Sequence, residues 1–197
     1  MVAFVMLFLT SGCGYNELTT KRETVKSTWA NVETQLQRRG DLIGNMIEVA
    51  KMAGVQEQEV FGTIAEARSR LLNASKEAPA GEDGDKTPEQ KQKVIDAANS
   101  FGGTIGRLMM LTENYPQLKS NENFLKAQDE VVSTENRIAT ARKDYNDKVQ
   151  DYNTTMKQFP MVISAKLFGF KEEPYFKVDE AAKAVPKIDA NSLRKPK

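Results

Sequence analysis

The stretch FLKAQDEVVSTENRIATARKDYNDKVQDYNTTMKQF, residues 124–159, decides the fold because an apolar or aromatic residue returns at every seventh position. The members of this series are Phe124, Val131, Ile138, Tyr145, Tyr152 and Phe159. Such a period, sustained without a miss, is typical of a long helix packed side by side with others. A helix over residues 121–159 would be about 58 Å long at 1.5 Å per residue.

An earlier stretch, from Thr20 to about Met52, shows the same periodicity. Its apolar positions form two interleaved series, Val25, Val32, Met46 and Ala53 in one and Trp29, Leu36, Ile43 and Ala50 in the other. Alternating steps of four and three residues form the apolar seam of a helix packed against its neighbours. Gly54 follows this stretch and is expected to cap the helix.

Two shorter helices are expected between these long ones, over residues 56–74 and 87–113. The stripe of the first consists of Val60, Ile64, Ala67 and Leu71, with Phe61 and Leu72 beside it. The second begins with a clear signal, because Thr87 is a good N-cap, Pro88 suits the first turn and Gln90 completes a capping box. Its apolar residues are Val94, Ile95, Ala98, Phe101, Ile105, Leu108 and Leu111.

The connections complete the fold prediction. Residues 76–86 are rich in Gly, Pro and acidic residues and predict an exposed loop. Pro116 interrupts the chain after the third helix, and the apolar patch 161–170 predicts a short helix that folds back. We therefore predict an all-α protein, an antiparallel four-helix bundle of long, amphipathic, coiled-coil-like helices.

Composition excludes several kinds of chemistry. The chain has 197 residues, with 28 Lys and Arg against 27 Asp and Glu, so its net charge offers no field that would attract nucleic acid. It has no histidine, the commonest general base and metal ligand, and Cys13 is its only cysteine. A di-metal site of the ferritin type needs histidine, and no catalytic motif is present. We therefore expect no enzyme activity, no metal and no cofactor.

The N-terminus resembles a bacterial lipoprotein signal. Residues 1–9 are an unbroken apolar run, and the small residues Ser11 and Gly12 precede Cys13. In that pattern the peptide is cut before the cysteine, which then carries acyl chains. The alternatives are an uncleaved signal anchor, although 12 residues span only about 18 Å of a roughly 30 Å hydrocarbon core, and a cytosolic protein.

These observations divide the chain into four parts. Residues 1–12 are predicted to be a signal peptide and residues 13–19 a lipid anchor and linker. Residues 20–176 are predicted to form the helical domain. Residues 177–197 are predicted to form a flexible basic tail.

Arg39, Glu135 and Arg142 are charged residues at seam positions where apolar residues are expected, and they suggest a candidate polar layer. It comprises Arg39, Glu113, Glu135, Arg142 and Tyr145. One interpretation is a pocket for a ligand or a lipid headgroup. The other is a layer of ion pairs that fixes the register of the helices.

A second repeat pairs tyrosine with asparagine one heptad apart, at Tyr145-Asn146 and Tyr152-Asn153. Core tyrosines whose hydroxyl ends remain in contact with water would explain it. A peptide-binding stripe is the alternative.

Several blocks of the chain, in order, resemble the LemA family. They are Gly14-Tyr15-Asn16, residues 29–43 (WANVETQLQRRGDLI), residues 112–119 (TENYPQLK), residues 134–138 (TENRI), residues 141–146 (ARKDYN), Tyr152-Asn153, Phe159-Pro160, Gly169-Phe170 and Tyr175-Phe176. The resemblance covers residues 14–176. It implies a four-helix bundle on the outer face of a bacterial cytoplasmic membrane, held by an N-terminal anchor and without established catalytic residues.

The resemblance also bears on partners. Family members are often encoded near a membrane zinc metalloprotease of the M48 class or a small phosphatase-like envelope domain, which implies an envelope protein as partner. We therefore expect a membrane-tethered scaffold or adaptor that faces away from the cytoplasm, binds no nucleic acid and is able to self-associate. The alternatives are a lipid or small-molecule carrier with a cavity between its helices, and a hydrolase that uses Glu or Lys.

Overall fold

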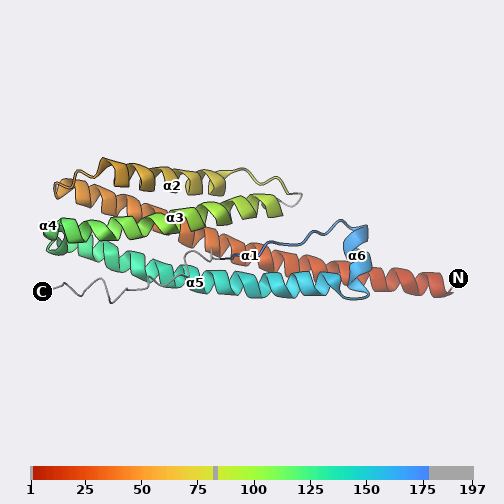
Figure 1. The fold of residues 1–197 in the computed structure, drawn as a ribbon. Helices are drawn as coiled ribbons and strands as arrows, with labels where there is room; N and C mark the ends of the chain where they lie inside the picture. Colours follow the sequence, from red (N-terminus) through yellow and green to blue (C-terminus); the bar gives the residue numbers. More distant parts are fainter. Residues whose placement is uncertain (1, 82–83, 178–197) are drawn as a thin grey trace, which may run out of the picture.

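The computed structural model describes residues 2–81 and 84–177, with side chains from Gly14 onward. This part of the chain contains six helices and no strand (Figure 1). They are α1 (Val2–Met52), α2 (Gln58–Lys76), α3 (Pro88–Asn114), α4 (Pro116–Lys119), α5 (Glu122–Lys157) and α6 (Met161–Leu167). The prediction of an all-α protein is confirmed.

The helices pack as two antiparallel pairs. The most extensive contact joins α1 to α5, and the next joins α2 to α3 (Figure 1). The α2–α3 pair covers the half of α1 and α5 that lies far from the N-terminus. In the other half, α6 and the extended chain after it lie against α1 and α5.

The α1–α5 contact buries both predicted seams. On α1 these are Val25, Trp29, Val32, Leu36, Ile43, Met46 and Ala50; on α5 they are Phe124, Val131, Ile138, Tyr145 and Tyr152. The rings of Trp29 and Tyr145 meet with their centroids 5.1 Å apart. Burial of large side chains at about 25 cal/mol per Å² makes this seam the main source of stability.

Local signals in the sequence set the helix ends. The hydroxyl of Thr87 accepts a hydrogen bond from the backbone N–H of Gln90, and the Gln90 side chain accepts one from the backbone of Thr87, so the predicted capping box is present. Gly54 has φ +83°, a conformation that favours glycine and ends α1. Asn121 caps α5 by accepting hydrogen bonds from two backbone N–H groups.

Two of the differences from the predicted boundaries affect the α1–α5 seam. The helix expected from Thr20 already begins at Val2, because residues 14–20 contain no proline and the buried Leu18 extends the seam. The assignment of Phe159 to the α5 seam was wrong. α5 ends at Lys157, so Phe159 has left the helix and is 82% exposed.

No helix in the described ranges is long and apolar enough to cross a membrane. The predicted basic tail, apart from Lys177, lies outside the described residues.

The end of the α5 seam can be tested with two phenylalanines of the same series. Phe124→Ala should lower the free energy of unfolding by about 3–5 kcal/mol, because it opens a cavity at a fully buried site. Phe159→Ala should change it by less than about 0.5 kcal/mol, because that side chain is exposed. Urea unfolding followed by circular dichroism measures both; a large loss for Phe159→Ala would extend the seam to that residue.

Candidate functional site

Arg39 is the centre of the predicted polar layer. Its side chain is 2% exposed and projects from α1 toward α3 and α5. Nη1 donates to Oε1 of Glu135 at 2.9 Å, and Nη2 donates to the carbonyl oxygen of Ala98 at 3.0 Å. The guanidinium also lies 5.2 Å from the centre of the Phe101 ring. One cation thus contacts two other helices, which is the geometry of a register-fixing layer.

Arg142, about two helical turns after Glu135 on α5, belongs to the same charge group. Burial, and to a smaller extent the positive charge of Arg39, lower the pKa of Arg142 to about 10, although the negative charge of Glu135 opposes both effects. Its guanidinium stacks 4.2 Å from the centre of the Phe176 ring. Two arginines therefore share a single carboxylate here, which keeps both cations close to one negative charge.

The structure does not bring the other two members of the predicted layer to Arg39. Glu113 is exposed in the last turn of α3, 15 residues and about 22 Å of helix beyond Ala98, the α3 residue that Arg39 contacts. Tyr145 is buried, but its hydroxyl donates to the carbonyl oxygen of Pro174. The side chain of Cys13, the predicted lipidation site, lies outside the described side chains.

The Tyr-Asn repeat holds an extended segment of the same chain, residues 170–177, which we call the C-terminal strap. The side chain of Asn153 donates to the carbonyl oxygen of Glu173 at 2.9 Å and accepts from its N–H at 3.0 Å. Asn146 does the same with Phe176, at 3.0 and 2.7 Å. Each amide side chain thus satisfies both main-chain groups of one strap residue, as a neighbouring β-strand would.

The spacing of the two asparagines fits the geometry of the strap. Seven residues of helix advance about 10.5 Å, and three residues of extended chain advance about 10 Å, so Asn153 and Asn146 face Glu173 and Phe176 in register. The strap therefore runs antiparallel to α5.

The two tyrosine hydroxyls also donate hydrogen bonds to the strap, one before Glu173 and one between Glu173 and Phe176. Tyr145 donates to Pro174 at 2.8 Å, and Tyr152 donates to Lys171 at 3.0 Å. Burial is the main reason that the pKa of Tyr145 is raised and that of Tyr152 is raised to about 12. Both hydroxyls thus stay protonated donors, and the repeat combines core tyrosines with a stripe that binds a peptide of its own chain.

The strap also closes over a buried ion cluster that the sequence analysis missed. Nζ of Lys91 on α3, which has no exposed surface, lies 2.8 Å from Asp85 and 3.0 Å from Glu173. Burial raises the pKa of Glu173, and the positive charge of Lys91 counteracts this effect. The signal was available, because Lys91 precedes the seam residue Ala98 by one heptad.

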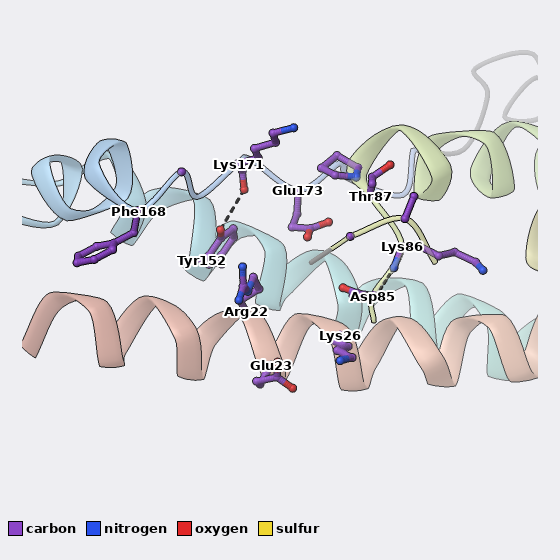
Figure 2. A pocket seen from close by; sticks show the side chains of 14 residues that line it. Arg22, Glu23, Lys26, Asp85, Lys86, Thr87, Tyr152, Phe168, Lys171 and Glu173 are labelled. Atoms are coloured by element: carbon purple, nitrogen blue, oxygen red, sulfur yellow. Dashed lines mark hydrogen bonds between the residues drawn. The ribbon is translucent and has the colours of Figure 1, made fainter. Parts of the chain in front are cut away.

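A pocket of about 350 Å³ opens beside this cluster, between α1, the loop before α3 and the strap (Figure 2). Its charged lining residues are Arg22, Glu23, Lys26, Asp85, Lys86, Lys171 and Glu173. This mixed-charge hollow suits a small polar ligand better than an acyl chain. The described residues contain no group of His, Cys, Asp or Glu side chains that could hold a metal ion.

Comparison with known proteins identifies the family of the chain. The sequence model described as LemA family matches residues 28–189, which include the Tyr-Asn repeat, Arg39 and the strap. The chain belongs to the LemA family. This match extends past Phe176, the last residue of the blocks recognised in the sequence.

Three relatives of this LemA-family chain are magnetosome proteins by name. Magnetosome protein MamQ 2 and magnetosome protein MamQ 1 of Paramagnetospirillum magneticum are each 29% identical to it over 188 residues, covering 89% of this chain and 68% of the relative. Magnetosome protein MamQ of Magnetospirillum gryphiswaldense is 27% identical over 188 residues, with the same coverage.

Asn153→Ala tests whether this LemA-family chain holds its strap through side-chain amides. The substitution leaves the buried N–H of Glu173 without a partner, which costs about 1–3 kcal/mol. Hydrogen exchange at the amides of Glu173 and Phe176 should accelerate by roughly 5- to 150-fold. Asn136→Ala, at an exposed position of the same helix, is the control and should leave both rates unchanged. Unchanged rates in Asn153→Ala would show that other contacts hold the strap.

Substitutions of Glu135 and of Arg39, the two partners of the ion pair, should lower the free energy of unfolding by unequal amounts. Glu135→Ala leaves the buried Arg39 guanidinium beside Arg142 without its counter-charge. It should cost about 2–3 kcal/mol, less than a wholly buried pair because Glu135 is 42% exposed and solvent screens it. Arg39→Met keeps most of the volume and should cost about 1 kcal/mol or less.

Urea unfolding of the two variants and of Arg39→Met/Glu135→Ala measures the coupling between the partners. The double variant should be about as stable as Arg39→Met alone. Arg107→Met, at an exposed position on α3, is the matched control. Equal losses for both single variants would contradict a register-fixing ion pair.

Proposed function

We propose that this protein is a membrane-tethered helical scaffold or adaptor of the bacterial cell envelope, attached through acyl chains on Cys13 and facing away from the cytoplasm. In this proposal α1, α2, α3 and α5 act together as an antiparallel four-helix bundle. No reaction is assigned to the protein.

The observation that carries the proposal is the continuity of α1. One helix runs from Val2, within the apolar N-terminal run, to Met52 at the far end of the domain. From Leu18 onward it forms half of the main seam. An anchor at Cys13 would therefore be joined to the core through uninterrupted helix and not through a loose linker.

The far end of the domain offers a contact for a partner. Large apolar side chains are exposed there at Met52, Met110 and Leu125, by 79%, 61% and 42%. These three residues lie near the ends of α1 and α3 and the start of α5, which meet at this end (Figure 1). From Gly14 to Met52 the helix advances about 57 Å, so the partner would be met well above the membrane.

Family membership supports a membrane-associated protein without catalytic activity. The names of three relatives also associate them with a bacterial structure, the magnetosome. An envelope protein such as an M48-class metalloprotease or a phosphatase-like domain is the partner that the family resemblance suggests. The exposed apolar end suits docking to a folded protein surface.

The first test is intact-mass analysis and fractionation of the protein from its native membrane. The wild type should lack residues 1–12, carry acyl groups on Cys13 and enter the detergent phase, since two or more acyl chains give stable attachment. Cys13→Ser should lose the acyl mass, and a variant that lacks residues 1–13 should move to the aqueous phase. A photo-crosslinking residue at Met110 should form an adduct with an envelope protein only in the tethered chain.

Ser27→Ala, at an exposed position of α1, is the control and should behave as the wild type. A wild-type mass without lipid would contradict the lipid anchor. Equal adducts from the tethered and untethered chains would contradict an adaptor that works from the membrane.

A further inference from the structure

The short helix α6 buries its small residues and exposes its large apolar residues. The small residues Ser164 and Ala165 are buried against the rest of the protein, 6% and 4% exposed. The large apolar residues Ile163, Leu167 and Phe168 are 57%, 70% and 49% exposed. Phe159, just before the helix, is 82% exposed. Amphipathic helices of soluble domains show the opposite arrangement.

Close packing holds α6 in this orientation. A Cβ atom placed on Gly14 of α1 would lie 2.9 Å from Oγ of Ser164 and 3.0 Å from Sδ of Met161, so a larger residue there would have to displace these side chains. The ring of Phe168 also packs against Tyr15, with the two centroids 4.8 Å apart. The outward face of α6 is therefore not free to rotate inward.

The position of α6 along α1 identifies what covers this face. Gly14, which contacts α6, follows Cys13 directly and lies one helical turn or so beyond the apolar run of residues 1–9. If Cys13 carries the lipid, the bilayer begins one residue from the contact with α6. If the N-terminal run instead enters the bilayer as an anchor, α6 again lies at its surface. Figure 1 shows α6 beside α1, closer to the N-terminal end than the α2–α3 pair is.

The chemistry of the face fits the boundary between acyl chains and headgroups. Phe159, Phe168 and Tyr15 supply aromatic rings, which gather at membrane interfaces. Lys166 is exposed in the last turn of α6, and Lys171 is exposed just after it. Exposed lysines beside an apolar face favour anionic headgroups.

We propose that α6, with Phe159, is a second membrane contact, in which Ile163, Leu167 and Phe168 enter the interface of an anionic bilayer. This inference rests on the proposed tether, which brings the face to the membrane. The tether alone would leave the domain free to tilt. The second contact fixes its tilt and rotation, so that the exposed end at Met52 points away from the bilayer.

Tryptophan probes in the full chain test the proposal. Leu167→Trp places an indole on the face, and Met52→Trp places one at an equally exposed position at the far end. The native Trp29 is buried in both, and the wild type measures its contribution. Each protein is reconstituted into vesicles of phosphatidylcholine and phosphatidylglycerol whose acyl chains carry bromine, which quenches tryptophan on contact. Quenching should be at least about threefold stronger for Leu167→Trp, because an interfacial side chain reaches 5–10 Å into the bilayer.

A second probe, Phe159→Trp, replaces one exposed aromatic side chain by another. It therefore tests the same face even if Leu167→Trp fails to fold. Flotation of the vesicles separates the possible failures. Protein that floats while the probes at 159 and 167 are quenched no more than Met52→Trp retains its tether but overturns this inference. Protein that does not float overturns the tether and the second contact together. A blue shift of Leu167→Trp that grows with protein concentration, without quenching, would place a second copy on the face and overturn the proposal.

Discussion

The packing of α1 against α5 is the constraint on which the rest of the structure depends. The two helices are far apart in the sequence and are joined along seams that bury Trp29 against Tyr145. Because Tyr145 and Tyr152 face α1, the next residue of each pair, Asn146 or Asn153, lies at the flank of the seam. The apolar contact thus sets where α5 presents its amide side chains, and these hold the strap.

Two buried cations tie the remaining elements to this seam. Arg39 reaches from α1 to α3 and α5, and Lys91 joins α3 to the strap through Glu173. Each cation occupies a heptad position at which an apolar residue would avoid the free-energy cost of desolvating a charge. Each is also paired with a carboxylate that is distant in the chain. Such pairs contribute little net stability but disfavour other registers, since a slipped helix would leave a buried charge without its partner. The strap is therefore held by both long-range ion pairing and main-chain recognition.

Much of the fold could be predicted because its causes are local. The heptads of α1 and α5, the capping box at Thr87 and Gln90, and the terminal Gly54 depend on residues within one or two helical turns. The candidate site could be predicted only in part. Arg39 and Glu135 stood out as charges on a seam and meet in the structure, whereas Glu113 lies about 22 Å along α3 from the layer. Periodicity specifies which face of a helix is buried. It does not specify which positions along two helices lie opposite one another.

The sequence by itself determined the helices, most of their ends and the faces that they bury, because these follow from spacing and capping. Tertiary structure alone decided that the Tyr-Asn repeat holds residues 170–177, that Lys91 finds Glu173, and that α6 exposes its large apolar residues. Each of these pairs groups that are distant in sequence or depends on a close approach such as that of Gly14 to Ser164. The physical reason is that amide, charge and steric complementarity act over a few ångströms. Only the packed chain brings such groups within that distance.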